Sequence, residues 1–233
     1  HSDTEVILKA YEEFGAECVL HLNGIFAFAI WDQRRKLLFI GRDRMGIKPL
    51  YYAITDDSLI FASELKVMLA HPRVDRHVDL VSLNDYLTFE YVPTPRSIIK
   101  GVKKLPPGHT LTVQGGRVDV NQYWDVRLER SETGRQSERE YQRELLDRLE
   151  DSVKRELVSD VPVGVLLSGG LDSSAIAVMA ARHYPGRIQT FTAAFEDASF
   201  DESRYARLVA RGVGADHHEM TVSANDLLGL VPR

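Results

Sequence analysis

Short apolar runs separated by polar turns fill the first half of the chain, and this alternation predicts antiparallel β-structure. The runs at 26–31 and 36–40 flank the polar turn 32–35, which is the pattern of a β-hairpin. A second hairpin is expected over Gly115-Gly116. The other expected strands lie at 50–53, 59–63, 110–114 and 117–124. Helices are expected at 6–14, 16–22, 64–70 and 81–91.

Polar residues at the ends of these elements suit caps and turns. Asp3 can cap the helix at 6–14, and Gly15 can end it. The charged turn 42–49 is interpreted as a solvated loop, and His109 as a turn residue. None of these positions requires a catalytic role on its own.

Helical spacing follows in the second half of the chain. Apolar residues at every fourth position, with charges between them, predict an amphipathic helix that packs one face inward. These positions are Tyr141, Leu145, Leu149, Val153 and Leu157. Residues 125–137 are polar without apolar periodicity, as is typical of a linker. We therefore expect a first domain at 1–126, a linker at 127–138 and a second domain at 139–233.

The rest of the second half predicts a parallel sheet. The run 163–167 has the length and branching of a buried strand, 175–181 has the composition of a packed helix, and 188–195 predicts another strand. A strand, a helix and a strand at this spacing indicate a parallel βαβ unit, which binds ligands at the carboxyl ends of its strands. A helix at 203–212, a strand at 219–222 and a helical pattern over 226–233 follow.

Composition narrows the classes of function. The chain has 233 residues, 44% of them hydrophobic, enough for one large or two modest cores. A net charge of −5 and the absence of a basic stripe with aromatics argue against a nucleic-acid partner. No run reaches the length of a membrane span. The single cysteine, Cys18, cannot form an internal disulfide and is expected in the apolar side of the helix at 16–22, so a reducing cytoplasm is the expected compartment.

The ends of the chain suggest a piece of a longer protein. It begins at His1, without Met and without the pattern of a signal peptide. It ends in GLVPR at 229–233, which is either native or a remnant of a protease-cleavable tag. We expect a fragment that lacks both ends.

The stretch VPVGVLLSGGLDSS at 161–174 carries the strongest chemical signal. A strand-to-helix turn presents free backbone N–H groups at a helix N-terminus, and glycines let the backbone approach an anion. Ser168, Ser173 and Ser174 add hydroxyl groups. Asp172 beside bound phosphates makes sense mainly with a divalent cation, and we expect Mg²⁺ there. No lysine stands in the loop, so the Walker A pattern is not met. The plain alternative is a turn that binds nothing.

Two resemblances give this loop a context. SGGLDSS resembles the ATP-pyrophosphatase families, whose SGGxDS loop holds the β- and γ-phosphates while ATP is cut between α and β. The series SDTEVIL, LNGIFAFAIWD, GRDRMGIKPLYY and FASELK is similar to the glutaminase domain of the glutamine-hydrolysing asparagine synthetases. That family carries the VPVGVLLSGGLDSS stretch at the start of its synthetase domain, so both halves agree in identity and order.

The resemblance implies a fold and a set of site residues. The fold is α/β overall: an N-terminal-nucleophile type α+β domain with antiparallel sheets, followed by the start of a parallel-sheet α/β ATP-pyrophosphatase domain. Asp3 matches the aspartate that holds the α-amino group of glutamine, as an alternative to N-capping. The family's N-terminal Cys nucleophile is absent, and internal Cys18 cannot replace it. The residues expected at ATP or pyrophosphate are Leu166, Leu167, Ser168, Gly169, Gly170, Asp172, Ser173 and Ala193.

The implied reaction is the ATP-dependent amidation of aspartate through β-aspartyl-AMP, with ammonia taken from glutamine. ATP and Mg²⁺ are the implied cofactors, and glutamine, aspartate and ATP the substrates; a homodimer is left open. The fragment alone is not expected to be fully active. Two alternatives remain. One is a related adenylating enzyme, such as a β-lactam synthetase or an amidotransferase with another acceptor, and the other is a non-catalytic nucleotide-binding paralogue.

A second cluster, Asp216-His217-His218-Glu219, invites a metal-binding interpretation. Adjacent histidines in an extended segment point to opposite sides, which suits a zinc site poorly. We expect the segment to lead into a strand instead.

Overall fold

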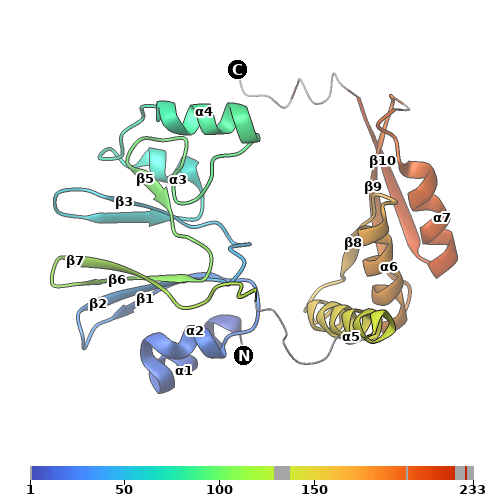
Figure 1. Ribbon diagram of the computed structural model, residues 1–233, viewed down its shortest axis with the longest axis horizontal. Coiled ribbons are helices and arrows are strands. Elements are labelled where there is room, and N and C mark those ends of the chain that lie inside the picture. The colour runs from blue at the N-terminus through green and yellow to red at the C-terminus, as the bar shows by residue number, and fades with distance from the viewer. Residues whose placement is uncertain (1, 129–136, 198, 224–228, 230–233) are drawn as a thin grey trace. The chain divides into compact units, whose positions relative to one another are not determined.

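The computed structural model describes residues 2–128, 137–197, 199–223 and 229. The chain forms two compact units, 1–129 and 130–233, drawn in blue to green and in yellow to red in Figure 1. The linker expected at 127–138 falls mostly on residues outside the described ranges, and its bounds stay a prediction. The helical pattern at 226–233 also lies outside them, apart from residue 229.

The first unit begins with helix α1, Asp3–Phe14, which Gly15 ends at a φ of 58°. The cap is Ser2, whose hydroxyl oxygen accepts from the Glu5 N–H at 3.4 Å, so Asp3 as N-cap is wrong. Asp3 stands one position too late, inside the first turn. A short 3₁₀ turn, η1 (Gly15–Glu17), and helix α2 (Cys18–His21) follow, with Cys18 fully buried as expected.

Two antiparallel sheets form the body of this unit. The first has the order β1-β2-β6-β7 and contains both expected hairpins. Its strands are β1 (Ala27–Asp32), β2 (Leu37–Arg42), β6 (His109–Gln114) and β7 (Arg117–Gln122). The second has the order β4-β3-β5, with β3 (Tyr51–Ile54), β4 (Leu59–Ala62) and β5 (Val102–Lys104). Alternation along the sequence finds strands without assigning them to sheets, which is why it did not separate the two sheets.

One core joins these sheets. Ile40 and Leu111 from the first sheet pack with Tyr52 from the second, and Leu50 and Leu105 complete the cluster. Helices α3 (Leu65–Ala70) and α4 (Leu80–Phe89) belong to the same unit, and Met68 of α3 is buried against the second sheet. The interpretation of 42–49 as a solvated loop is wrong at its start, because Arg42 and Asp43 are 8% and 1% exposed.

The second unit is a three-stranded parallel sheet with helices packed on it. Helix α5 (Glu138–Glu156) starts with a capping box between Ser137 and Glu140. The elements that follow are β8 (Gly164–Leu166), α6 (Leu171–His183), β9 (Gln189–Phe195), α7 (Ser203–Val213) and β10 (Asp216–Val222). The strand order is β10-β9-β8, and both pairings are parallel, which confirms the expected βαβ unit.

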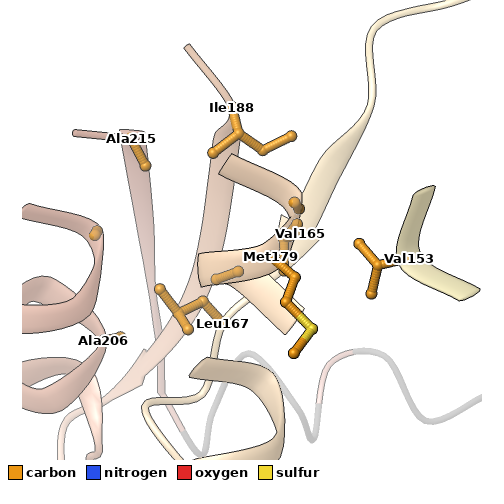
Figure 2. Close-up of a cluster of buried hydrophobic side chains, with 10 residues drawn as sticks. Val153, Val165, Leu167, Met179, Ile188, Ala206 and Ala215 are labelled. Carbon is orange, nitrogen blue, oxygen red and sulfur yellow. The ribbon is translucent and has the colours of Figure 1, made fainter. Parts of the chain in front are cut away.

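The core of this unit lies between the sheet and its three helices (Figure 2). Val153 of α5 and Met179 of α6 contribute to the same cluster as Val165 and Leu167 at the end of β8. Burial alternates along β9, so one face of the sheet is covered while Phe191, Ala193 and Phe195 belong to the other. The fold class expected from the sequence, antiparallel α+β followed by parallel α/β, is confirmed.

Candidate functional site

The turn between β8 and α6 is anchored to the neighbouring strand. The Leu167 N–H donates to the Phe191 carbonyl at 2.8 Å, and the Thr192 hydroxyl donates to the Leu167 carbonyl. Leu167 itself is buried in the core. The turn that starts at residue 168 therefore leaves the carboxyl end of β8 from a fixed position beside the middle of β9.

Two glycines shape the turn in different ways. Gly169 has a φ of 87°, and a Cβ there would lie 2.7 Å from the Ala206 nitrogen in the first turn of α7. Only glycine fits so close to that backbone. Gly170 is the N-cap residue of α6, and no side chain forms a capping hydrogen bond there. The amide groups that begin α6 are thus left for an anion, where the helix dipole favours negative charge.

Serine hydroxyls hold the turn together. The hydroxyl oxygens of Ser168 and Ser173 lie 3.0 Å apart, and the Ser173 hydroxyl also accepts from the Ser168 N–H at 3.3 Å. The Gly170 N–H donates to the Ser168 hydroxyl at 3.3 Å. Helix α6 begins at residue 171, four residues earlier than expected, so Asp172 and Ser173 belong to its first turn. Asp172 is exposed and contacts no ionic or hydrogen-bonding partner among the described residues.

A pocket of about 460 Å³ opens at the carboxyl ends of β8 and β9. It brings Leu166, Leu167 and Ser168 together with Ala193, four residues expected at ATP from the sequence. The other four residues expected at ATP follow Ser168 closely in the sequence but do not line the pocket: Gly169, Gly170, Asp172 and Ser173. Its remaining lining residues are Phe191, Phe195, Phe200 and Glu202.

Phe200 and Glu202 line this pocket but were not among the site residues predicted from the sequence. Both lie in the segment between β9 and α7. One sequence feature could have identified these two residues. Their segment follows the carboxyl end of a parallel strand, which is where sheets of this kind bind ligands.

Asp3 lines a separate pocket of about 510 Å³ in the first unit. The pocket lies between the start of α1, the chain at 25–30, and two further segments, 48–49 and 63–64. Lys48 and Glu64 add one positive and one negative charge to its lining, and both were missed in the sequence. Glu64 is paired with Lys66, whose amine lies 2.7 Å from its carboxylate.

The other candidate residues have structural partners. Burial raises the pKa of the Cys18 thiol, which makes it a poor nucleophile. The prediction of His109 as a turn residue is wrong, because His109 is the first residue of β6; its Nδ1 lies 2.7 Å from the Pro107 carbonyl oxygen. His217 lies 2.8 Å from the Thr190 hydroxyl, and His218 stacks on Phe191 with ring centroids 5.0 Å apart. In the described ranges no group of three or more His, Cys, Asp or Glu residues could hold a metal ion.

The helices that the structure describes include none long and apolar enough to cross a membrane.

Comparison with known families matches both halves of the chain. Residues 1–124 match the family model "Glutamine amidotransferase domain", and residues 144–233 match "Asparagine synthase". Asparagine synthetase [glutamine-hydrolyzing] 3 of Bacillus subtilis is 38% identical over 97% of this chain and 39% of its own length. Asparagine synthetase [glutamine-hydrolyzing] 1 of the same organism is 35% identical over 100% of this chain and 36% of its own length. The chain therefore spans well under half of these relatives.

Among solved structures, glutamine phosphoribosylpyrophosphate amidotransferase from B. subtilis aligns with a TM-score of 0.36 at 13% identity, over 98% of this chain and 66% of that one. The family matches, which cover more than half of the chain, confirm the resemblance found in the sequence motifs. The chain belongs to the glutamine amidotransferase domain family, with a segment of the asparagine synthase family following that domain.

Proposed function

We propose that this chain is the glutaminase and ATP-binding part of a glutamine-dependent asparagine synthetase. In this reaction glutamine is hydrolysed to glutamate and ammonia by the first domain. The second domain joins the aspartate side-chain carboxylate to the α-phosphate of ATP, which releases pyrophosphate. Ammonia then displaces AMP and leaves asparagine. Adenylation is required because a carboxylate is a poor electrophile.

The observation that supports this proposal best is the uncapped start of α6 beside a pocket at the strand ends. Gly169 and Gly170 bring backbone N–H groups to a position where the helix dipole favours an anion. The adjoining pocket has apolar walls and is of a size that small ligands occupy. We therefore assign the pyrophosphate end of ATP to the turn and its adenosine end to Leu166, Leu167 and Ala193.

Backbone groups in the turn would stabilise charge that moves onto the leaving pyrophosphate. They are preorganised, because Ser168 and Ser173 fix the turn and Gly169 packs on α7. Donors of this kind contribute about 3 kcal/mol each to transition-state stabilisation. The turn needs no lysine if several such donors act together with a cation.

The residues present fit a magnesium ion. Mg²⁺ keeps several waters and is held by one or two carboxylates plus substrate phosphates, so a complete protein cage is not required. Asp172 in the first turn of α6 is exposed and has no ion pair within the described ranges. It would hold Mg²⁺ against the phosphates, and the ion would neutralise their charge.

On the glutamine side, we assign the α-ammonium group of the substrate to Asp3, which lines the pocket of the first unit. We do not assign Cys18, the one cysteine of this chain, as the nucleophile, because it is fully buried. We place the protein in the cytoplasm, where its single buried thiol would stay reduced.

An exchange assay tests the role of the turn in the full-length protein. Aspartate-dependent exchange between ATP and labelled pyrophosphate should fall by at least about 100-fold in Asp172→Ala, the loss expected when one preorganised electrostatic group is removed. Glutamine hydrolysis should be unchanged. Asp160→Ala removes an exposed carboxylate outside the pocket and serves as the control. Wild-type exchange in Asp172→Ala would overturn the assignment.

A further inference from the structure

Arg42 and Asp43 are the charged residues that the described part of the chain buries, at 8% and 1% exposure. Burying a charge is costly unless hydrogen bonds compensate for the lost water. Two adjacent buried charges therefore require hydrogen-bonding partners, and those partners show which segments the two residues hold in place.

The Arg42 guanidinium group binds three backbone carbonyls. Its Nε donates to the Lys48 carbonyl at 2.8 Å, and its Nη2 donates to the Gly46 carbonyl at 2.6 Å. Its Nη1 donates to the Leu105 carbonyl. Burial lowers the pKa of Arg42, although the neighbouring Asp43 opposes that shift. The side chain thus connects the turn 44–49 to the segment that follows β5.

The Asp43 carboxylate accepts hydrogen bonds from backbone N–H groups of the same turn. Its Oδ1 accepts from the Ile47 N–H at 2.9 Å, and its Oδ2 accepts from the Lys48 N–H at 3.0 Å. Its own N–H donates to the Phe26 carbonyl at 2.8 Å. Asp43 therefore connects the turn to the chain just before β1.

Two of the residues that Arg42 and Asp43 hold also line the pocket that contains Asp3. Lys48 lines that pocket and is held at both its N–H and its carbonyl, by Asp43 and Arg42 respectively. Phe26 lines it too and is held through its carbonyl. The buried pair does not line the pocket, yet it fixes two segments that do.

We infer that Arg42 and Asp43 are a positioning pair for the substrate of this pocket, an α-amino acid. Such a ligand carries an ammonium group, and the pocket has the carboxylate of Asp3 to bind it. The pair sets where the Lys48 backbone stands, and with it the shape of the wall. This inference rests on the proposed glutaminase function.

A purely structural role predicts something different. If the pair only stabilised the turn, its loss would lower thermal stability and leave glutamine affinity unchanged. Tyr123→Phe provides a matched control, because the Tyr123 hydroxyl donates to the Arg42 carbonyl at 2.8 Å without belonging to the pocket wall. It removes a hydrogen bond from the same pair but leaves Lys48 and Phe26 held.

The test compares Asp43→Asn with Tyr123→Phe in the full-length protein, by glutamate release at varied glutamine. Asp43→Asn replaces an acceptor by a donor facing Ile47 or Lys48, so KM for glutamine should rise about tenfold with kcat within about twofold, as the loss of one charge-assisted hydrogen bond allows. Tyr123→Phe should keep the wild-type KM. Arg42→Lys, which frees the Lys48 carbonyl while keeping the charge, should raise KM in the same way.

Amide hydrogen exchange of the present chain measures how firmly the pocket wall is held, without requiring catalysis. Because the side chain in Asp43→Asn keeps one acceptor oxygen, one of the Ile47 and Lys48 amides should exchange at least about tenfold faster than in Tyr123→Phe, which leaves both hydrogen bonds in place. Equal exchange, or an unchanged KM in both Asp43→Asn and Arg42→Lys, would overturn the inference. A wild-type protein that releases no glutamate would instead contradict the proposed function.

Discussion

Replacing Gly169 by alanine should damage the turn between β8 and α6. The residue has a φ of 87°, where a Cβ is strained, and the new Cβ would lie 2.7 Å from both the Ala206 nitrogen and the Tyr205 Cβ. Both atoms belong to the first turn of α7, so no flexible side chain can swing aside. The turn must move away from α7 or the helix must shift.

The magnitude follows from these two effects. The backbone conformation alone costs about 1–2 kcal/mol for a residue with a Cβ. With the close contact added, the second unit should lose at least about 2 kcal/mol, which lowers the Tm of a domain near 100 residues by roughly 10 °C. Gly170→Ala is the matched control, because Gly170 has a φ of −69° and its new Cβ would meet only the Ser168 Oγ, at 3.4 Å.

The assay is thermal unfolding of the chain followed by circular dichroism, together with ATP-dependent exchange in the full-length protein. Gly169→Ala should lower the transition of the second unit and raise KM for ATP, since the donors of the turn are displaced. Gly170→Ala should cost less than about 1 kcal/mol, because alanine is a poorer N-cap than glycine but its Cβ, at an ordinary φ, meets no backbone. Equal effects of the two substitutions, or a wild-type Tm and KM in Gly169→Ala, would show that the close packing of Gly169 on α7 does not shape the turn.

Two further predictions concern the first unit. The Cys18 thiol, fully buried and with its pKa raised by burial, should react with a thiol reagent at least about 100-fold more slowly in buffer than in denaturant; fast reaction in buffer would contradict the described core. Burial also raises the pKa of Tyr123 to about 12 from its ordinary value of 10.0, so folding favours its neutral form. That contribution is complete below about pH 10 and is lost as the pH rises toward about 12, so alkaline denaturation should begin in this window and be weaker in Tyr123→Phe; identical alkaline profiles would contradict it.

Local patterns in the sequence were enough for most elements of the fold. Apolar alternation at 26–31 and 36–40 located β1 and β2, and the spacing of four from Tyr141 located α5. The strand, helix and strand at 163–195 could be interpreted as parallel because a crossover helix leaves few other arrangements. These signals arise from each segment's own side chains, so they are visible without the fold.

Features that depend on distant segments were not visible. Nothing in GRDRMGIKPL shows that Arg42 would find the Leu105 carbonyl 63 residues away, or that Asp43 would be buried. The separation of the strands into two sheets is equally non-local. At the candidate sites, Leu166 to Ser168 and Ala193 could be brought together by the rule for parallel strands, whereas Lys48 enters its pocket only through tertiary packing.

The roles of individual residues at these sites remain predictions from a motif. The Ser168–Ser173 turn and the uncapped start of α6 agree with an anion site, and the Asp3 pocket has charges suited to an amino acid.

Substrate profiling of the exchange reaction would show which carboxylic acid the full-length protein activates. The full-length protein would be incubated with ATP, Mg²⁺, labelled pyrophosphate and one carboxylic acid at a time: aspartate, glutamate, β-alanine derivatives or no acid. An asparagine synthetase should return label to ATP with aspartate at least about 100-fold faster than with glutamate, since a site built for one side-chain length leaves buried polar groups unpaired with another. Exchange that is independent of aspartate, or faster with another acid, would contradict the account.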